Sequence, residues 1–300
     1  MNGDREVGAM TENNQTNTER DSYQRKLETM KQDRISLQAD YSMFLNLFMR
    51  KKYLFQLYKE LFPQDTNITE EDLRLVTLDN VLAIHPYNDL AVLAGNKLIV
   101  LAQAQANWSV YTIFRLADCY FDAAMGILQM SDTNSLDAEV FVIYTGNKRI
   151  ENDVLSLNQE FFGGDPNKPF KAKIIHGDYN HGILGEYMNF CRIFDETIRK
   201  ANAPEEKLYA VTTAIDRCIE NNVLAGYLKE NRSQAERIML ALFSPEYVKM
   251  ASERAEKIKV SISTLRFLHM PEEQIKDTIA KQYGIATEYV QSILDETTSA

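Results

Sequence analysis

The sequence has few cysteines, no long apolar run and no excess of basic charge. Its three cysteines, Cys119, Cys191 and Cys218, are far apart and form no Cys-x-x-Cys pair, which argues against a disulfide framework and against a zinc site. Each lies in an apolar helical pattern, so we expect buried thiols in a cytoplasmic protein. A catalytic thiol is the alternative, although no pattern of histidines points to one.

Other absences limit the class of protein. Residues 1–10 lack the apolar segment of a signal peptide, so we expect none. No stretch of about 18 apolar residues is present, so we expect no membrane-spanning helix. The formal net charge of -10 argues against binding nucleic acid over the whole surface, but it leaves room for a local basic groove.

The length of 300 residues predicts one sizeable domain, or one domain with an extension. Residues 1–21 are polar and lack periodicity, which predicts a disordered tail. Residues 22–39 have a charged helical pattern. Its apolar residues lie on one side: Tyr23, Leu27, Met30 and Leu37. Two alternatives remain for this segment, a solvated helix and a helix that pairs with another subunit.

Apolar residues recur at spacings of three, four and seven from Asp40 to Leu61, which predicts an amphipathic helix ended by Pro63. Three basic residues interrupt this pattern near its middle: Arg50, Lys51 and Lys52. They indicate either a solvated face or a break between two shorter helices.

The period then changes to that of β-strands. We expect a short strand at Leu73–Leu78 and a hairpin formed by Asp89–Leu93 and Leu98–Ala102, because turn residues 94–97 separate the last two segments. The second hairpin strand is continuously apolar, which predicts burial on both faces.

A helix at Tyr111–Met130 is apolar on most sides, so we expect it to cover the sheet. Further strands are expected at Val140–Tyr144 and Lys171–His176, followed by a helix at Ile183–Lys200. Pro204 is predicted to begin another helix, and the rest of the chain is helical. A hairpin followed by a helix and another strand predicts an α/β fold with a mixed sheet.

Polar residues gather where the predicted hairpin opens. Asp89 begins the first strand, and Gln103 and Gln105 follow the second, so antiparallel pairing should bring them together. This geometry is the frame of a metal-dependent phosphodiesterase, in which carboxylates hold Mg²⁺ and the metal activates water. The second acid position, however, is an amide.

At this point the sequence resembles the bacterial recombination-promoting nucleases, also called putative transposases, of the PD-(D/E)XK type. The resemblance covers roughly Asp40 to Lys257. It rests on these segments: Asn80–Leu82, Tyr87–Leu90 (YNDL), Leu98–Trp108, Phe141–Gly146 (FVIYTG), Leu157–Gly164 (LNQEFFGG), Val223–Leu228 and Leu242–Tyr247.

In that family the hairpin carries an aspartate and then Glu-x-Gln. The resemblance implies that Asp89 is a metal ligand, that Gln105 is the family's own glutamine, and that Gln103 replaces the family's glutamate. It further implies a Mg²⁺-dependent DNA endonuclease linked to recombination. Because Gln103 brings no charge, two alternatives follow: a weak nuclease helped by another acid, or an inactive nuclease fold that binds DNA or protein.

The resemblance also suggests a domain division. Residues 22–200 would form a PD-(D/E)XK nuclease-like mixed sheet flanked by helices. Residues 201–260 would form a helical extension and residues 261–300 a C-terminal helical element. The protein is thus expected to be cytoplasmic, with DNA as its partner, no membrane association, and homo-oligomer formation as an open alternative.

Each site residue also has a plainer interpretation. Asp89 could cap a turn, and Gln105 could satisfy backbone groups at a strand end. Candidates for a replacing acid are few; Glu60 and Asp79 are two, and for both we favour a surface acid or a helix-end charge. For His85, His176, His181 and Trp108 we favour loop or packing roles over metal or base contacts.

Basic residues that could contact phosphate are loosely grouped in the sequence. They are Arg50, Lys51, Lys52, Lys148, Arg149, Lys168, Lys171 and Lys173.

Near the C-terminus, Gly284 separates two short helices that resemble a helix-turn-helix. Its second helix, Glu288–Glu296, has acids and no Lys or Arg, which opposes reading of the DNA major groove and favours a packing or protein-interaction role.

Overall fold

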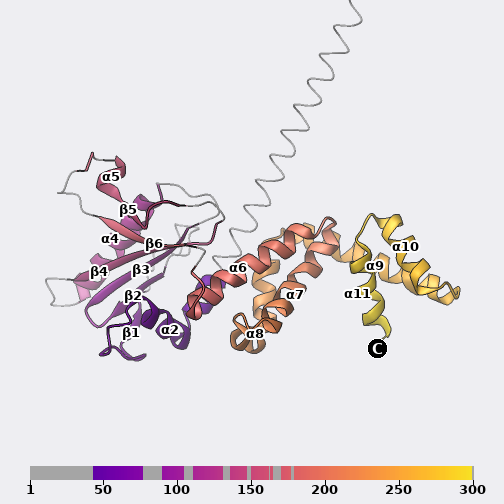
Figure 1. Cartoon of the computed structure of the whole chain (residues 1–300), viewed down its shortest axis with the longest axis horizontal. Helices are drawn as coiled ribbons and strands as arrows, with labels where there is room; N and C mark the ends of the chain where they lie inside the picture. Colours follow the sequence, from indigo (N-terminus) through magenta and orange to yellow (C-terminus); the bar gives the residue numbers. More distant parts are fainter. Residues whose placement is uncertain are drawn as a thin grey trace, which may run out of the picture.

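The fold was obtained as a computed structural model, which describes residues 43–76, 90–104, 111–130, 136–146, 150–161, 163–164, 170–176 and 179–298. Figure 1 shows a sheet with helices on both sides, continued by a run of helices toward the C-terminus. Among the described residues, no helix is both long enough and apolar enough to cross a membrane. The predicted tail and helix in residues 1–39 lie outside the described residues.

The sheet has six strands in the order β1-β2-β3-β4-β6-β5. Its strands are β1 (Leu73–Leu75), β2 (Leu90–Ala94), β3 (Lys97–Ala104), β4 (Asp137–Tyr144), β5 (Val154–Ser156) and β6 (Lys171–Ile175). The pairs β1–β2, β2–β3 and β5–β6 are antiparallel, whereas β3–β4 and β4–β6 are parallel. The predicted mixed sheet and its hairpin are confirmed.

The helices follow the expected positions, with some differences in their bounds. They are α2 (Lys51–Leu61), α4 (Thr112–Met130), α5 (Leu157–Phe161), α6 (Gly182–Lys200), α7 (Pro204–Glu220), α8 (Ala225–Leu240), α9 (Pro245–Phe267), α10 (Glu272–Tyr283) and α11 (Thr287–Thr298). Pro204 begins α7 as predicted. The short elements β5 and α5 were not predicted, because three strand residues carry no readable period.

The helix expected from Asp40 to Leu61 is interrupted within its described part. Residues 43–48 are helical, the chain turns at Met49, and Arg50 takes an extended conformation at the start of α2. Lys51 and Lys52 are exposed. The basic residues therefore mark a break between two helices, and two of them, Lys51 and Lys52, also form a solvated surface.

Alternation along the central strands separates two hydrophobic cores, because successive strand residues point to opposite faces. On one face, Ile99, Leu101 and Ile143 pack with residues 43–48, α2 and α6. On the other face, Val100 and Val142 pack against α4. All described side chains of β3 from Leu98 to Ala102 are buried, which confirms burial of this strand on both faces.

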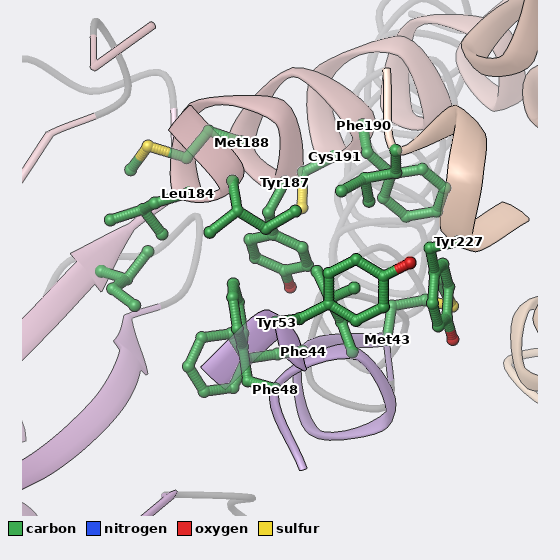
Figure 2. Packing of buried hydrophobic residues seen from close by; sticks show 14 of the residues in the cluster. Met43, Phe44, Phe48, Tyr53, Leu184, Tyr187, Met188, Phe190, Cys191 and Tyr227 are labelled. Carbon is green, nitrogen blue, oxygen red and sulfur yellow. The ribbon is translucent and has the colours of Figure 1, made fainter. Parts of the chain in front are cut away.

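The first core continues beyond the sheet into α7 and α8. Figure 2 shows its centre, where Tyr187 of α6 lies against the rings of Phe44 and Phe48. The ring centroids of Tyr187 are 5.6 Å from those of Phe44 and 5.7 Å from those of Phe48, both in edge-on geometry. This aromatic cluster joins the helical residues 43–48 to α6.

A third core forms within the C-terminal helices, where Ile258 and Ile262 of α9 pack with α10 and α11. Gly284 ends α10 in the left-handed conformation, with φ of 67°, as a C-terminal glycine does. Two buried acids of α7 hold this unit. Glu205 pairs with Arg254 of α9 at 2.8 Å, and Glu206 accepts a hydrogen bond from the amide of Ala286 at 2.5 Å.

Candidate functional site

The carboxyl ends of three parallel strands meet at one edge of the sheet. Gln103 of β3 pairs in register with Ile143 of β4, and Ile143 pairs with Ile175 of β6. The chain leaves these strands at Ala104, Tyr144 and Ile175. In open α/β sheets, ligands bind outside the carboxyl ends of the strands, so this edge is the candidate site.

The predicted hairpin geometry can be followed up to this edge. Leu90 at the start of β2 pairs with Leu101 near the end of β3, so the first strand does begin beside the end of the second. Asp89 and Gln105 lie outside the described residues, as do His85, Trp108 and Asp79. The closeness of Asp89 to the two glutamines therefore stays a prediction.

Two histidines follow β6 in the chain and have separate surroundings. His176 directly follows β6, and its Nε2 lies 2.9 Å from Oδ1 of Asp153. His181 precedes α6, and its ring lies 4.1 Å from that of Tyr179 between centroids. Across the described ranges, no group of three or more His, Cys, Asp or Glu residues could hold a metal ion. The described part of the edge supplies no alternative metal centre.

Glu60 has a role that the sequence did not reveal. Its carboxylate accepts hydrogen bonds from the backbone amides of Ile183 and from that of Leu184 at 3.2 Å, which caps the N-terminus of α6. Tyr179 donates a further hydrogen bond to it. Burial raises the pKa of Glu60, while the amide hydrogen bonds oppose that rise.

The start of α6 is shaped around this carboxylate. Gly182 has φ of +64°, and a Cβ there would collide with the carboxylate of Glu60. Of the two roles that we favoured, a surface acid or a helix-end charge, Glu60 has the second: it is a half-buried acid at a helix end, and the helix that it caps is α6. Because both of its oxygens are bound by amides, it is poorly placed to replace a missing metal ligand.

The described members of the basic set that we predicted to contact phosphate form two groups. At the start of α2, Arg50 donates to Oε1 of Gln234 at 3.1 Å and lies over the ring of Tyr227, and Lys51 and Lys52 are exposed beside it. On β6, Lys171 and Lys173 are both exposed.

The two groups lie on different elements, and only one of these elements ends at the candidate edge. Lys173 pairs with Glu139 at 2.8 Å, which offsets its charge, and it lies two residues before the row through Gln103. The α2 group instead contacts α8. Lys148, Arg149 and Lys168 lie outside the described residues. Of the described residues that we predicted to contact phosphate, those on β6 are the ones on a strand that ends at the edge.

The cysteines have no part in this site. Cys119, Cys191 and Cys218 form no disulfide and are buried, as predicted, and burial raises the pKa of the Cys218 thiol to about 12. A thiol with such a pKa is a poor nucleophile at neutral pH. The sequence matches no family model, no curated protein and no solved structure.

Proposed function

We propose that the chain is a PD-(D/E)XK-type, Mg²⁺-dependent DNA endonuclease of the recombination-promoting type whose cleavage is impaired. The observation that supports it best is the β2–β3 hairpin followed by α4 and the parallel strand β4. This order is the mixed sheet that the resemblance implies. It carries Gln103 to the edge where the carboxyl ends of the strands meet.

In this proposal Asp89 and Gln103 hold the metal and Gln105 lines the site. Mg²⁺ is usually bound by one or two carboxylates together with substrate phosphates. Asp89 is the one carboxylate of this pair, which meets only the lower limit, and phosphate oxygens would complete the coordination. When bound, the ion supplies charge at the scissile phosphate and activates water. Lys171 and Lys173 would contribute phosphate contacts on the β6 side.

A second candidate function is a nuclease fold that binds DNA or protein without cleaving. It is favoured by the environment of Glu60. The described acid that could have replaced the missing carboxylate is already bound by the amides of Ile183 and Leu184. Gln103 is neutral and the carboxylate of Glu60 is bound by backbone amides. Asp89 would therefore have to supply the negative charge that holds a metal.

The two candidates are separated by nicking of supercoiled DNA with Mg²⁺ or Mn²⁺, together with a DNA-binding assay. The impaired nuclease predicts slow nicking that is lost in Asp89→Ala and kept in Glu151→Ala, an exposed acid that serves as the matched control. DNA binding with no nicking under either metal would contradict the endonuclease and favour the binding protein. Nicking that survives Asp89→Ala would contradict the proposed site.

A further inference from the structure

The outer side of α4 carries an exposed apolar stripe. Tyr111, just before the helix, is 68% exposed, and Phe121 and Met125 are 58% and 55% exposed. Phe114 and Leu128 are exposed on the same side. These residues follow one another at spacings of three, four or seven, so they form one continuous face. Large exposed aromatic groups in such a row mark an interaction surface.

Neighbouring aromatic rings extend this stripe. The ring centroid of Phe161 in α5 lies 4.5 Å from that of Phe114 and 5.6 Å from that of Tyr111. Phe170, just before β6, stacks on Phe121 at 6.5 Å. Both rings are only partly buried. The surface is therefore an apolar strip bordered by rings from other elements, which suits a second helix lying along α4.

The stripe has the same spacing as a segment near the N-terminus. Five successive positions of the stripe, at spacings of three, four, three and four, are Tyr111, Phe114, Asp118, Phe121 and Met125. Five positions with these same spacings follow residue 26: Leu27, Met30, Arg34, Leu37 and Tyr41. Each row is apolar except at its central position, which is Asp118 in one and Arg34 in the other.

We propose that the exposed face of α4 binds residues 22–41 of a second copy of this chain, with Arg34 opposite Asp118. The two rows match in a 3-4 repeat, as in helix pairs that pack along a seam. The opposite charges meet at the centre, which selects this register over shifted ones. Since each copy has both surfaces, two copies can exchange segments and close a symmetric dimer.

The reach of the chain favours a second copy over the same one. Met43 and Phe44 are buried in the core on the opposite face of the sheet from α4. A helix outside α4 would lie about 25 Å or more from that core, since successive layers are spaced by roughly 8–10 Å. Tyr41 is only two positions before Met43 in the sequence, and this step spans at most about 7 Å.

The proposal is independent of the nuclease assignment and is tested by disulfide trapping. Full-length Arg34→Cys and Asp118→Cys proteins, one carrying a mass tag, are mixed and mildly oxidised. The native cysteines are buried, so the introduced ones should react first. We expect a disulfide-linked species that contains one copy of each variant, and little linkage of either variant alone.

The matched control replaces Arg34→Cys with Gln32→Cys, which places the thiol on the other side of the same predicted helix. Linkage of Gln32→Cys should fall at least about tenfold. Equal linkage at both positions would contradict a defined face. Absence of linkage in the mixture would overturn the proposal. A disulfide formed within one chain of the double variant Arg34→Cys/Asp118→Cys would assign the segment to the same copy and also overturn it.

Exchanging the charges of Asp118 and Arg34 tests the same helix register independently. Asp118→Arg should weaken self-association about tenfold or more, because two cations would then face each other across the seam. Combining it with Arg34→Asp should restore association by a similar factor. Sedimentation velocity measures both effects. Additive weakening in the double variant would contradict the pairing.

Discussion

Helices α4 and α6 each contain 19 residues and lie on opposite faces of the sheet, yet they differ in what covers their outer sides. After Gly182, the exposed residues of α6 are all charged: Arg192, Glu196, Arg199 and Lys200. The exposed residues of α4 are mostly aromatic or aliphatic. The outer side of α6 is thus a charged surface suited to solvent, whereas the outer side of α4 is an apolar surface suited to a partner.

The difference follows from the elements that surround each helix. Residues 43–48, α2, α7 and α8 enclose α6, and the acid Glu60 caps its first turn. Figure 1 shows α6 continuing from the sheet into the helical end of the molecule. In contrast, α4 packs on the sheet with one side only. Burial on several sides makes α6 the structural link between the two parts of the fold.

The largest expected effect compares one aromatic truncation on each helix. Tyr187→Ala should cost about 3–5 kcal/mol of unfolding free energy, because it removes a fully buried ring. Phe121→Ala should cost less than about 1 kcal/mol at concentrations where the chain is monomeric, because its ring is 58% exposed. Urea unfolding measures both.

Similar losses of unfolding free energy in Tyr187→Ala and Phe121→Ala would contradict the difference between the two helices. They would mean that the outer face of α4 is covered within a single chain. Loss of self-association in Phe121→Ala with little change in monomer stability would sharpen the distinction instead.

A smaller effect concerns the capped end of α6. Burial raises the folded pKa of Glu60 above the ordinary glutamate value of 4.5, so the folded state binds a proton more readily than the unfolded state. The contribution of Glu60 to stability is therefore greatest at pH below 4.5 and decreases as pH rises through the folded pKa. Glu60→Gln should remove this pH dependence.

The measurement is the difference in unfolding free energy between wild type and Glu60→Gln from pH 7 down to about pH 4, the range over which a raised glutamate pKa changes protonation. Relative to the variant, the wild type should gain stability as pH falls. A wild type that loses stability relative to the variant over this range would contradict burial as the dominant influence on Glu60.

The sequence predicted those helices and strands whose pattern of apolar residues is long or regular. The hairpin and α4 were found because Leu98–Ala102 is continuously apolar and Thr112–Met130 spans several turns. The break at Arg50 was one of two stated alternatives, since charge in a helical pattern can also be a solvated face. Short β5 and α5 carried too few residues to be recognised.

The candidate site was less accessible to sequence reasoning. Register placed Gln103 at the carboxyl edge, as expected from the hairpin. The cap formed by Glu60 on Ile183 could not be predicted, because 123 residues separate the two and no local pattern links them. Asp89 and Gln105 remain predictions from the pattern and the resemblance alone.

The most direct test of the nuclease frame is Mg²⁺-dependent nicking by Gln103→Glu compared with wild type. Restoring the acid should raise the rate about a hundredfold, because a single charge stabiliser at a reacting centre commonly has that effect. Adding Asp89→Ala to this variant should abolish the gain. A folded Gln103→Glu protein that nicks no faster than wild type would contradict the assignment of this edge as a metal-dependent phosphodiesterase site.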